Sequence, residues 1–403
     1  MSGSPTSDVV ATGSITIPIM KRLGYSKRFA GAVEVAASTG GSAMPPIMGS
    51  AAFILAEYTG TPYREIVYAA VLPALLYYCG VFLQVHLRAV REDLRPYGDD
   101  MPTLWGTVRL GWPFLIPIGI IIGVLMAGYS PVFTAGAGAA AVVAAAMLTA
   151  RTRMTLWRIV EALAETTLRI LPVAGACAAA GLVIGGLSMT GLGMKAANVI
   201  IEVSGGAAFA TLVIAAIVTI ILGLGMPTPS AYILAAVLVG PALIEVGFPM
   251  LASHMFLLYF AILSALTPPI AVAALAAAAI AQEDPFRIAF SAVRLAVLGF
   301  LMPFVFIWNP AIIGQGDPVQ IAMIAVGGMA AAAAIAVAVE WVCAASKVLG
   351  WGQRIMLLVG AVAAVAPEPM IASIGIVGTV VLLGVFYKRS QTEQVSSQTK
   401  NST

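Results

Sequence analysis

Four short stretches of this 403-residue chain combine helix-breaking glycines or prolines with hydroxyl side chains, inside otherwise apolar sequence. A broken helix frees backbone carbonyl oxygens beside those hydroxyls, and hard oxygen ligands at short range suit Na⁺ without any carboxylate. The half-helix that restarts after each break directs N–H groups and its positive dipole end towards the same place, which suits a carboxylate. The four stretches are residues 2–7, 38–46, 223–230 and 264–269.

These stretches predict a binding site built from broken helices. The hydroxyls of Ser4, Thr39, Thr228 and Thr267 are candidate cation ligands. The alternative is that glycine, serine and proline only kink and pack the helices, as they often do in membranes. Four breaks at related positions favour the ion site. Other serines and prolines of the stretches are expected to line a substrate cavity: Pro5, Ser7, Ser42, Pro45, Pro46, Pro229, Ser230, Pro268 and Pro269.

Two of the stretches repeat each other. Pro45-Pro46-Ile47 returns as Pro268-Pro269-Ile270, and this spacing defines a constant offset along the chain. The same offset, without a gap, pairs Pro62-Tyr63-Arg64 with Pro285-Phe286-Arg287. Helix breakers inside apolar runs are rarely reused by chance. Two copies of a broken-helix unit in one membrane chain are typical of a secondary transporter.

The composition sets the class of protein. The chain is 60% hydrophobic and 10% charged, with a mean hydropathy of +0.99, whereas soluble domains contain about 25% charged residues. We therefore expect an all-α polytopic membrane protein. The net charge of +3 gives no reason to expect a nucleic-acid partner. Three scattered cysteines and two histidines form neither a disulfide framework nor a metal spacing, and no catalytic constellation points to an enzyme.

Membrane spans can be read from the apolar runs, because a helix needs about 20 apolar residues to cross a bilayer. Residues 206–246 differ from a simple crossing: their two apolar arms meet at 223–229, where two prolines and two glycines cannot continue a helix. We interpret them as a hairpin that returns to the same side. Full crossings are predicted at 29–57, 66–87, 111–128, 131–150, 170–190, 252–281, 289–309, 319–345, 351–366 and 370–387.

Lysine and arginine predict the orientation of these spans. If the basic loop 21–28 is cytoplasmic, the other basic loops and the C-terminus are cytoplasmic too. The offset maps loop 21–28 onto 244–251, which contains Glu245 and no basic residue. The two repeat units should therefore be inverted in the membrane. The predicted outside loops, nearly free of basic residues, are 58–65, 191–205, 310–318 and 367–369.

The offset also predicts the domain organisation. Met1 corresponds to Leu224, at the tip of the second hairpin, so the first unit lacks an entering arm and the chain is expected to be N-terminally incomplete. A fragment, a misplaced start codon and one half of a split permease are all open interpretations. The expected parts are the end of the first repeat (1–90), the second repeat (91–315), extra membrane helices (316–387) and a disordered cytoplasmic tail (388–403).

A few titratable residues lie near these elements. Asp8, just past the first tip, is expected to face the cavity or to be a solvated loop carboxylate. Glu34 is expected to pair with Lys27 or Arg28 at the membrane interface rather than to relay protons. His254 is interpreted as a boundary residue.

The motifs resemble those of the large membrane subunit of the tripartite ATP-independent periplasmic (TRAP) transporters. The resemblance covers about residues 1–315, and the fused permeases that work with TAXI-type receptors match best, since residues 316–387 look like their extra helices. The strings that carry it are Gly3-Ser4-Pro5-Thr6-Ser7-Asp8, Ala30-Gly31-Ala32-Val33-Glu34, Ser38-Thr39-Gly40-Gly41, Pro45-Pro46-Ile47-Met48-Gly49, Gly223-Leu224-Gly225-Met226-Pro227-Thr228, Leu266-Thr267-Pro268-Pro269 and Trp308-Asn309-Pro310.

This resemblance implies an elevator mechanism in the bacterial inner membrane, with Na⁺ as the coupling ion. It also implies a periplasmic TAXI-type solute-binding protein and small-subunit-like helices, on a missing N-terminal region or a separate chain. The implied substrates are organic acids such as dicarboxylates, 2-oxo acids or glutamate-like compounds. A proton-coupled carrier and a non-transporting fragment or assembly partner remain alternatives. The implied sodium ligands are Ser4, Thr6, Ser38, Thr39 and Gly41 at one site, and Gly225, Pro227, Thr228, Ser264 and Thr267 at the other.

Overall fold

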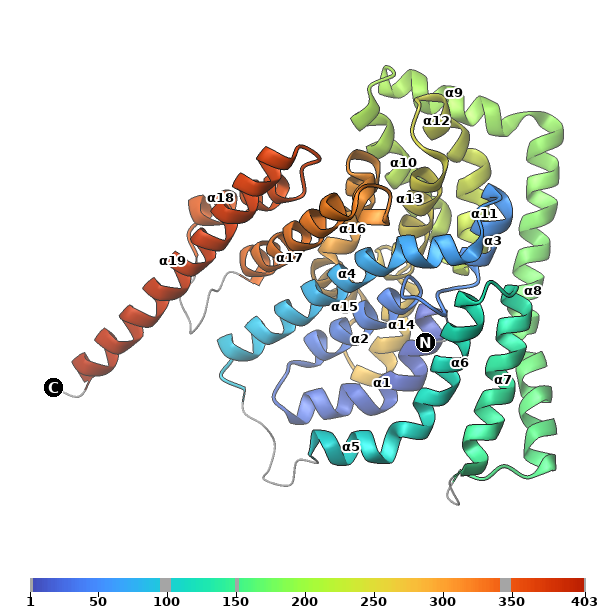
Figure 1. Ribbon diagram of the computed structural model, residues 1–403, viewed down its shortest axis with the longest axis horizontal. Coiled ribbons are helices and arrows are strands. Elements are labelled where there is room, and N and C mark those ends of the chain that lie inside the picture. The colour runs from blue at the N-terminus through green and yellow to red at the C-terminus, as the bar shows by residue number, and fades with distance from the viewer. Residues whose placement is uncertain (1–2, 95–102, 149–151, 341–348, 402–403) are drawn as a thin grey trace.

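The structure is a computed structural model that describes residues 3–94, 103–148, 152–340 and 349–401 (Figure 1). All regular elements in these ranges are helices, which confirms the predicted all-α fold. Within them, four helices are long and apolar enough to cross a membrane, or up to six if each of two bent helix pairs counts as one span. The chain is therefore a multi-pass membrane protein.

The first repeat unit contains a discontinuous helix, as predicted. α1 begins after Ser4, whose side chain accepts a hydrogen bond from the backbone N–H of Ser7, and Ser26 caps α2 in the same way. α2 ends at Gly41, and the helix resumes only at Ala51. The helices of this unit are α1 (Pro5–Arg22), α2 (Lys27–Gly41), α3 (Ala51–Thr59) and α4 (Tyr63–Arg91).

The second unit follows the first at the predicted offset. Thr228, which begins α11, is the equivalent of Pro5 at the start of α1, and Met250, which begins α13, is the equivalent of Lys27 at the start of α2. α10 and α11 pack against each other across the short connection 224–227, as expected for a hairpin. The elements of this unit are α10 (Ala208–Gly223), α11 (Thr228–Leu238), α12 (Gly240–Glu245), α13 (Met250–Leu263), the 3₁₀ turn η2 (Ser264–Leu266), α14 (Val272–Ala281), α15 (Pro285–Leu295) and α16 (Val297–Trp308).

Unusual backbone conformations also recur at this offset. Gly24 and Gly247, which end corresponding turns, have φ of 102° and 98°. Met48 and Ala271, which precede the second half of each broken helix, have φ of 49° and 45°. Positive φ is uncommon for residues other than glycine. Its recurrence at matching positions therefore supports the repeat found in the sequence.

The two units exchange half-helices. α14 of the second unit packs against α1 and α2 of the first (Figure 1), and its counterpart α3 packs against α11 and α13 of the second. The exchange places fully buried side chains from both units in one core, including Val35, Leu55, Tyr232, Phe256 and Ala277. The helices that flank each break are therefore packed inside protein, although Pro269 and Ile270 of the second break are exposed.

The remaining helices flank this core on opposite sides (Figure 1). α17 (Pro318–Glu340) packs against α4 and joins the two last helices to the core. On one side lie α5 (Leu104–Gly111), η1 (Trp112–Phe114), α6 (Leu115–Met126), α7 (Pro131–Leu148) and α8 (Leu156–Thr190), followed by α9 (Leu192–Ser204). On the other side, beyond the turn η3 (Pro310–Ile313), lie α17 (Pro318–Glu340), α18 (Trp351–Ala364) and α19 (Pro369–Asn401).

Three segments differ from the sequence-based prediction. The expected outside loop 191–205 forms α9, because its apolar residues recur at helical spacing and bury Ala197 and Ile200. The expected crossing 289–309 is bent by 43° between α15 and α16. The expected disordered tail is helical as far as Asn401, in a segment without glycine or proline after Gly384. The predicted span ends at 149–150 and 341–345 lie outside the described residues.

Candidate functional site

The two helix breaks meet at one narrow crevice. Thr39 and Gly40 lie at the end of α2 and Ala43 lies in the break that follows, whereas Ile262 and Leu263 end α13 just before the second break. α2 also packs directly against η2, the turn that follows α13. The helices behind these breaks complete the crevice with Ala74, Tyr77, Tyr259 and Gly299. The structure thus brings together two regions that lie far apart in the chain.

The start of α1 is fastened to the break in its own unit. The Ser42 hydroxyl donates a hydrogen bond to the carbonyl oxygen of Gly3 at 3.2 Å. The carbonyl of Ser42 in turn accepts from the backbone N–H of Gly49 at 2.8 Å. Ser42 therefore links the first tip to both ends of the loop between α2 and α3.

The second tip is fastened by a comparable bond. The single hydroxyl hydrogen of Ser264 is shared between the carbonyl oxygen of Gly223, the last residue of α10, at 3.1 Å and that of Ala261 at 2.7 Å. A Cβ atom on Gly223 would lie 2.4 Å from the Ser264 Oγ, so only glycine allows this approach. In both units, then, a serine at a helix break donates to a carbonyl at a hairpin tip. Ser42 and Ser264 were both among the predicted site residues, whereas their hydrogen bonds to the carbonyls of Gly3 and Gly223 were not predicted.

The hydroxyl groups at the breaks retain unused acceptor capacity. Thr39 donates to the carbonyl of Val35 at 2.7 Å, and Thr267 donates to that of Leu263 at 2.8 Å. Each threonine oxygen still has a lone pair after donating its hydrogen. Ser230 Oγ is buried and has no hydrogen-bond partner in the described part of the chain. Such oxygens fit a hard monovalent cation.

No group of three or more His, Cys, Asp or Glu side chains that could hold a metal occurs among the described residues.

The predicted site residues are not all brought to the crevice, and among the predicted cation ligands only Thr39 lines it. The others lie at the tips and loops around it. Ser38, Gly41, Thr228, Pro229 and Ser264 are buried, together with Pro5, Ser42 and Ser230. Ser4, Thr6, Pro45, Pro46, Thr267 and Pro268 are partly buried, and Ser7, Gly225, Pro227 and Pro269 are exposed.

Glu34 does not form the predicted pair with Lys27 or Arg28. Its carboxylate is 6% exposed and accepts hydrogen bonds from the hydroxyls of Thr12 and Thr16 on α1. The prediction was wrong because residues six or seven positions apart on a helix are not direct neighbours, whereas those three or four apart are. The Arg28 guanidinium instead donates to Ser291 on α15.

Ser38, one turn after Glu34, completes this arrangement by donating to the same carboxylate at 3.4 Å. Thr12 and Thr16 share one face of α1, and Glu34 and Ser38 share one face of α2. That double spacing is the sequence signal that could have indicated the contact. The contact of Glu34 joins α1, the first helix of the unit, to the part of α2 that leads into the break.

Two other titratable residues are buried inside the protein. His254, near the start of α13, is 2% exposed, and its Nδ1 lies 2.9 Å from the hydroxyl of Tyr232. Asp8 is 8% exposed and lies in the first turn of α1, where the helix dipole favours a carboxylate. The interpretation of Asp8 as a solvated loop carboxylate was therefore wrong.

Two tyrosines of the crevice were missed in the sequence. Tyr77 donates to the carbonyl of Ala36 at 2.7 Å, and the Tyr259 hydroxyl is buried without a hydrogen-bond partner in the described residues. Both lie in apolar helices, where an aromatic residue is ordinarily interpreted as a packing residue rather than as part of a binding site. Nothing in the local sequence marks them, because only the fold places them opposite Thr39.

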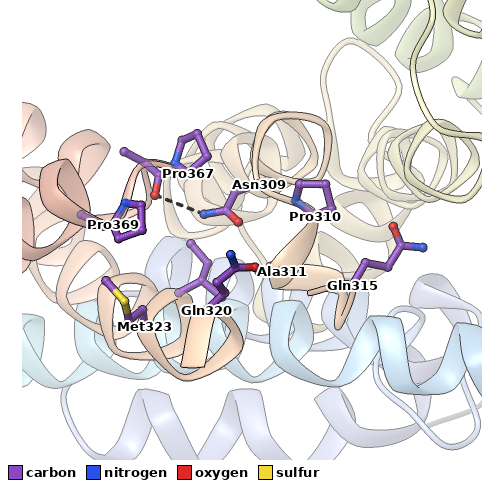
Figure 2. A pocket seen from close by; sticks show the side chains of 11 residues that line it. Asn309, Pro310, Ala311, Gln315, Gln320, Met323, Pro367 and Pro369 are labelled. Atoms are coloured by element: carbon purple, nitrogen blue, oxygen red, sulfur yellow. Dashed lines mark hydrogen bonds between the residues drawn. The ribbon is translucent and has the colours of Figure 1, made fainter. Parts of the chain in front are cut away.

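A second, more polar pocket lies at the end of the repeat (Figure 2). The side-chain amide of Asn309 donates to the carbonyls of Val365 and Ala366 at 3.3 and 3.2 Å. Gln315 and Gln320 line the same pocket. This pocket joins η3 to the turn between α18 and α19, so we assign it to the attachment of the C-terminal helices rather than to the broken-helix site.

Comparison with known proteins agrees with this geometry. The family described as "Tripartite ATP-independent periplasmic transporter, DctM component" matches residues 1–321. A C4-dicarboxylate TRAP transporter large permease protein, DctM, from Vibrio cholerae serotype O1 (strain ATCC 39315 / El Tor Inaba N16961) is 29% identical over 136 residues. That alignment covers 33% of this chain and 29% of the relative, so less than a third of the relative's length is matched.

Proposed function

Because this chain belongs to the family of the DctM component of tripartite ATP-independent periplasmic transporters, we propose that it is the membrane subunit of a secondary transporter that imports an organic acid. The observation that carries the proposal is the meeting of two repeat-related helix ends, around Thr39 and Leu263, at one narrow crevice beside the two breaks. Broken helices at a repeat interface are where secondary transporters bind substrate and coupling ion.

The proposal also includes Na⁺ as the coupling ion. The residues that would hold Na⁺ are Ser38, Thr39 and Gly41 at the first break, with Ser4 and Thr6 at its tip. Their counterparts are Ser264, Thr267, Gly225, Pro227 and Thr228. Bound Na⁺ would supply positive charge beside a carboxylate substrate. The support from the fold is that Thr39 and Thr267 hold their hydroxyls at the two interrupted helix ends.

We also propose that this subunit acts with other polypeptides in the bacterial inner membrane. A periplasmic TAXI-type solute-binding protein would deliver the acid, and small-subunit-like helices would complete the scaffold. The extra helices α17–α19 support the TAXI-type assignment because they extend beyond the residues matched by the family. In an elevator mechanism, the units that contain the breaks would move against the flanking helices.

Uptake of a labelled acid into proteoliposomes tests the proposal. The vesicles should hold this chain with its complementary membrane segments, and the receptor should be added outside. We expect accumulation that requires an inward Na⁺ gradient and falls when Thr39→Val or Thr267→Val is introduced. Thr59→Val is the matched control, because Thr59 makes the same type of bond, to Leu55 at 2.7 Å, outside the crevice. Accumulation that is indifferent to Na⁺ would refute sodium coupling.

Proton coupling is the second candidate, and one observation favours keeping it. Glu34 is a buried carboxylate on the helix that leads into the first break. Uptake driven by a pH gradient and abolished by Glu34→Gln would support protons as the coupling ion. Full activity of both Glu34→Gln and Asp8→Asn would exclude these carboxylates. Normal assembly with partner chains but no uptake under any gradient would support the non-transporting alternative.

A further inference from the structure

An apolar groove lies between α16, α17 and α18. Its volume is about 500 Å³, and the side chains that line it in the described part of the chain are apolar, apart from the indole N–H of Trp308. Leu301 and Phe304 line the groove from α16, Ala331 lines it from α17 and Leu358 from α18. The residues of the helix breaks do not line it, so the broken-helix site does not account for this groove.

The groove is open to the outside of the protein. Among its lining residues, Leu301 is 44% exposed and Val362 is 72% exposed. α17, which forms one wall, is long and apolar enough to cross a membrane. Around such a span the surroundings are acyl chains rather than water, and these chains are as apolar as the groove itself. An acyl chain can therefore lie in the groove, and a polar group at its end would decide which lipid is held there.

The polar pocket shown in Figure 2 adjoins this groove, because Ala366 and Pro367 line both cavities. Two candidate membrane spans also begin at the pocket. Gln320 lies in the first turn of α17, and Pro369 is the first residue of α19. The two cavities together thus lead from an apolar groove to a polar end, at the level where two spans enter the membrane. This arrangement fits an amphipathic molecule.

The polar end offers hydrogen-bond acceptors. Asn309 donates the two hydrogens of its side-chain amide to two backbone carbonyls, so its Oδ1 remains an acceptor. Gln320 Oε1 accepts from the backbone N–H of Asp317 at 3.4 Å and keeps a second lone pair. Asp317, directly before α17, and Glu368, directly before α19, add two carboxylates. These acceptors suit a group that donates several hydrogen bonds.

The charge of the pocket is negative. Its lining residues all come from the segments 309–324 and 366–372, in which the charged residues are Asp317 and Glu368. Neither carboxylate forms an ion pair among the described residues. Each precedes the first turn of a helix, whose dipole offsets about half a charge, so a net negative charge remains. A positively charged group is therefore favoured here, and an anion is disfavoured.

We propose that the groove and the pocket together bind a phospholipid with a primary ammonium headgroup, of the phosphatidylethanolamine class. One acyl chain lies in the groove, and the ammonium group, which has three N–H donors, lies at the acceptors of the pocket. A choline headgroup lacks these donors, and phosphatidylglycerol lacks the positive charge. The bound lipid connects α16 to α18 and to the start of α19. The inference does not depend on transport activity.

The test uses the purified full chain in nanodiscs of phosphatidylethanolamine, phosphatidylcholine and phosphatidylglycerol in equal parts, all with the same acyl chains. Lipid retained after transfer to detergent would be measured by native mass spectrometry. We expect the wild type to retain phosphatidylethanolamine in preference to the other two. Val362→Trp places a large side chain over the groove and should lower retention about fourfold or more, the effect of one buried CH₂ group. Val359→Trp is the matched control, because Val359 is an exposed residue of α18 that does not line the groove.

Asp317→Asn and Glu368→Gln test the headgroup. Each should lower the preference for phosphatidylethanolamine over phosphatidylglycerol about twofold to fivefold, whereas Glu202→Gln, at an exposed position on α9, should leave it unchanged. Equal retention of the three lipids by the wild type would overturn the proposal, as would equal losses in Val362→Trp and Val359→Trp. Retention of no lipid would also overturn it, and would indicate that a further membrane segment or a second copy of the chain covers the groove.

Discussion

At the scale of single residues, the second hairpin tip depends on the absence of a side chain at Gly223. An added Cβ would lie 2.4 Å from the Oγ and 2.7 Å from the Cβ of Ser264. Gly223→Ala should break the bond from Ser264 and displace the tip, with a loss of about 1–3 kcal/mol typical of overpacking. Thermal unfolding in detergent would measure this. Gly186→Ala, inside α8 where nothing lies within 4 Å, is the control and should keep or raise the melting temperature, because alanine is more stable than glycine within a helix.

Glu34 provides a second prediction at this scale. Glu34→Ala removes the acceptor shared by Thr12, Thr16 and Ser38, and should lower the free energy of unfolding by about 1–3 kcal/mol. Glu34→Gln should cost less, because the amide oxygen still accepts a hydrogen bond. Glu202→Ala, at an exposed position on α9, is the control for loss of a carboxylate. Equal melting temperatures for Glu34→Ala and Glu202→Ala would contradict this role.

At the scale of the elements, much of the fold could be predicted because helix breakers are local signals. The interruptions after Gly41 and Leu266, and the connection between α10 and α11, follow from glycine and proline alone. The contacts of Glu34 could have been suspected from the matching spacing of Thr12 and Thr16 on α1 and of Glu34 and Ser38 on α2. Those of His254 and Tyr259 could not be predicted, because they depend on how α11 and α4 pack around the breaks, and such distant contacts leave no pattern in the local sequence.

The start of α14 allows a test of the broken-helix conformation. Ala271 has φ of 45°, a conformation that disfavours any residue with a Cβ by about 1–2 kcal/mol. Ala271→Gly should therefore leave the free energy of unfolding unchanged or raise it by about 1 kcal/mol. Ala277→Gly, inside the same helix, should lower it by at least about 0.5–1 kcal/mol. Comparable losses in the two variants would contradict a left-handed conformation at Ala271.

At the scale of the whole molecule, the arrangement of the two units decides whether the breaks can alternate between the two faces of the membrane. Lys27 and Met250 are the first residues of α2 and α13 and are equivalent positions of the two units. In an inverted repeat they are on opposite sides of the membrane, whereas in a simple duplication they are on the same side. Both positions are exposed, so one experiment distinguishes these arrangements.

Lys27→Cys and Met250→Cys, each in a chain without Cys79, Cys177 and Cys343, would be treated with a membrane-impermeant maleimide. We expect Met250→Cys to be labelled in intact right-side-out vesicles and Lys27→Cys only in inverted ones, because the basic loop at 21–28 favours the cytoplasm. Labelling of both positions from one side would exclude inversion. The matching helix boundaries would then indicate a duplication in which both breaks open to the same face, and an elevator built on two inverted units would be impossible.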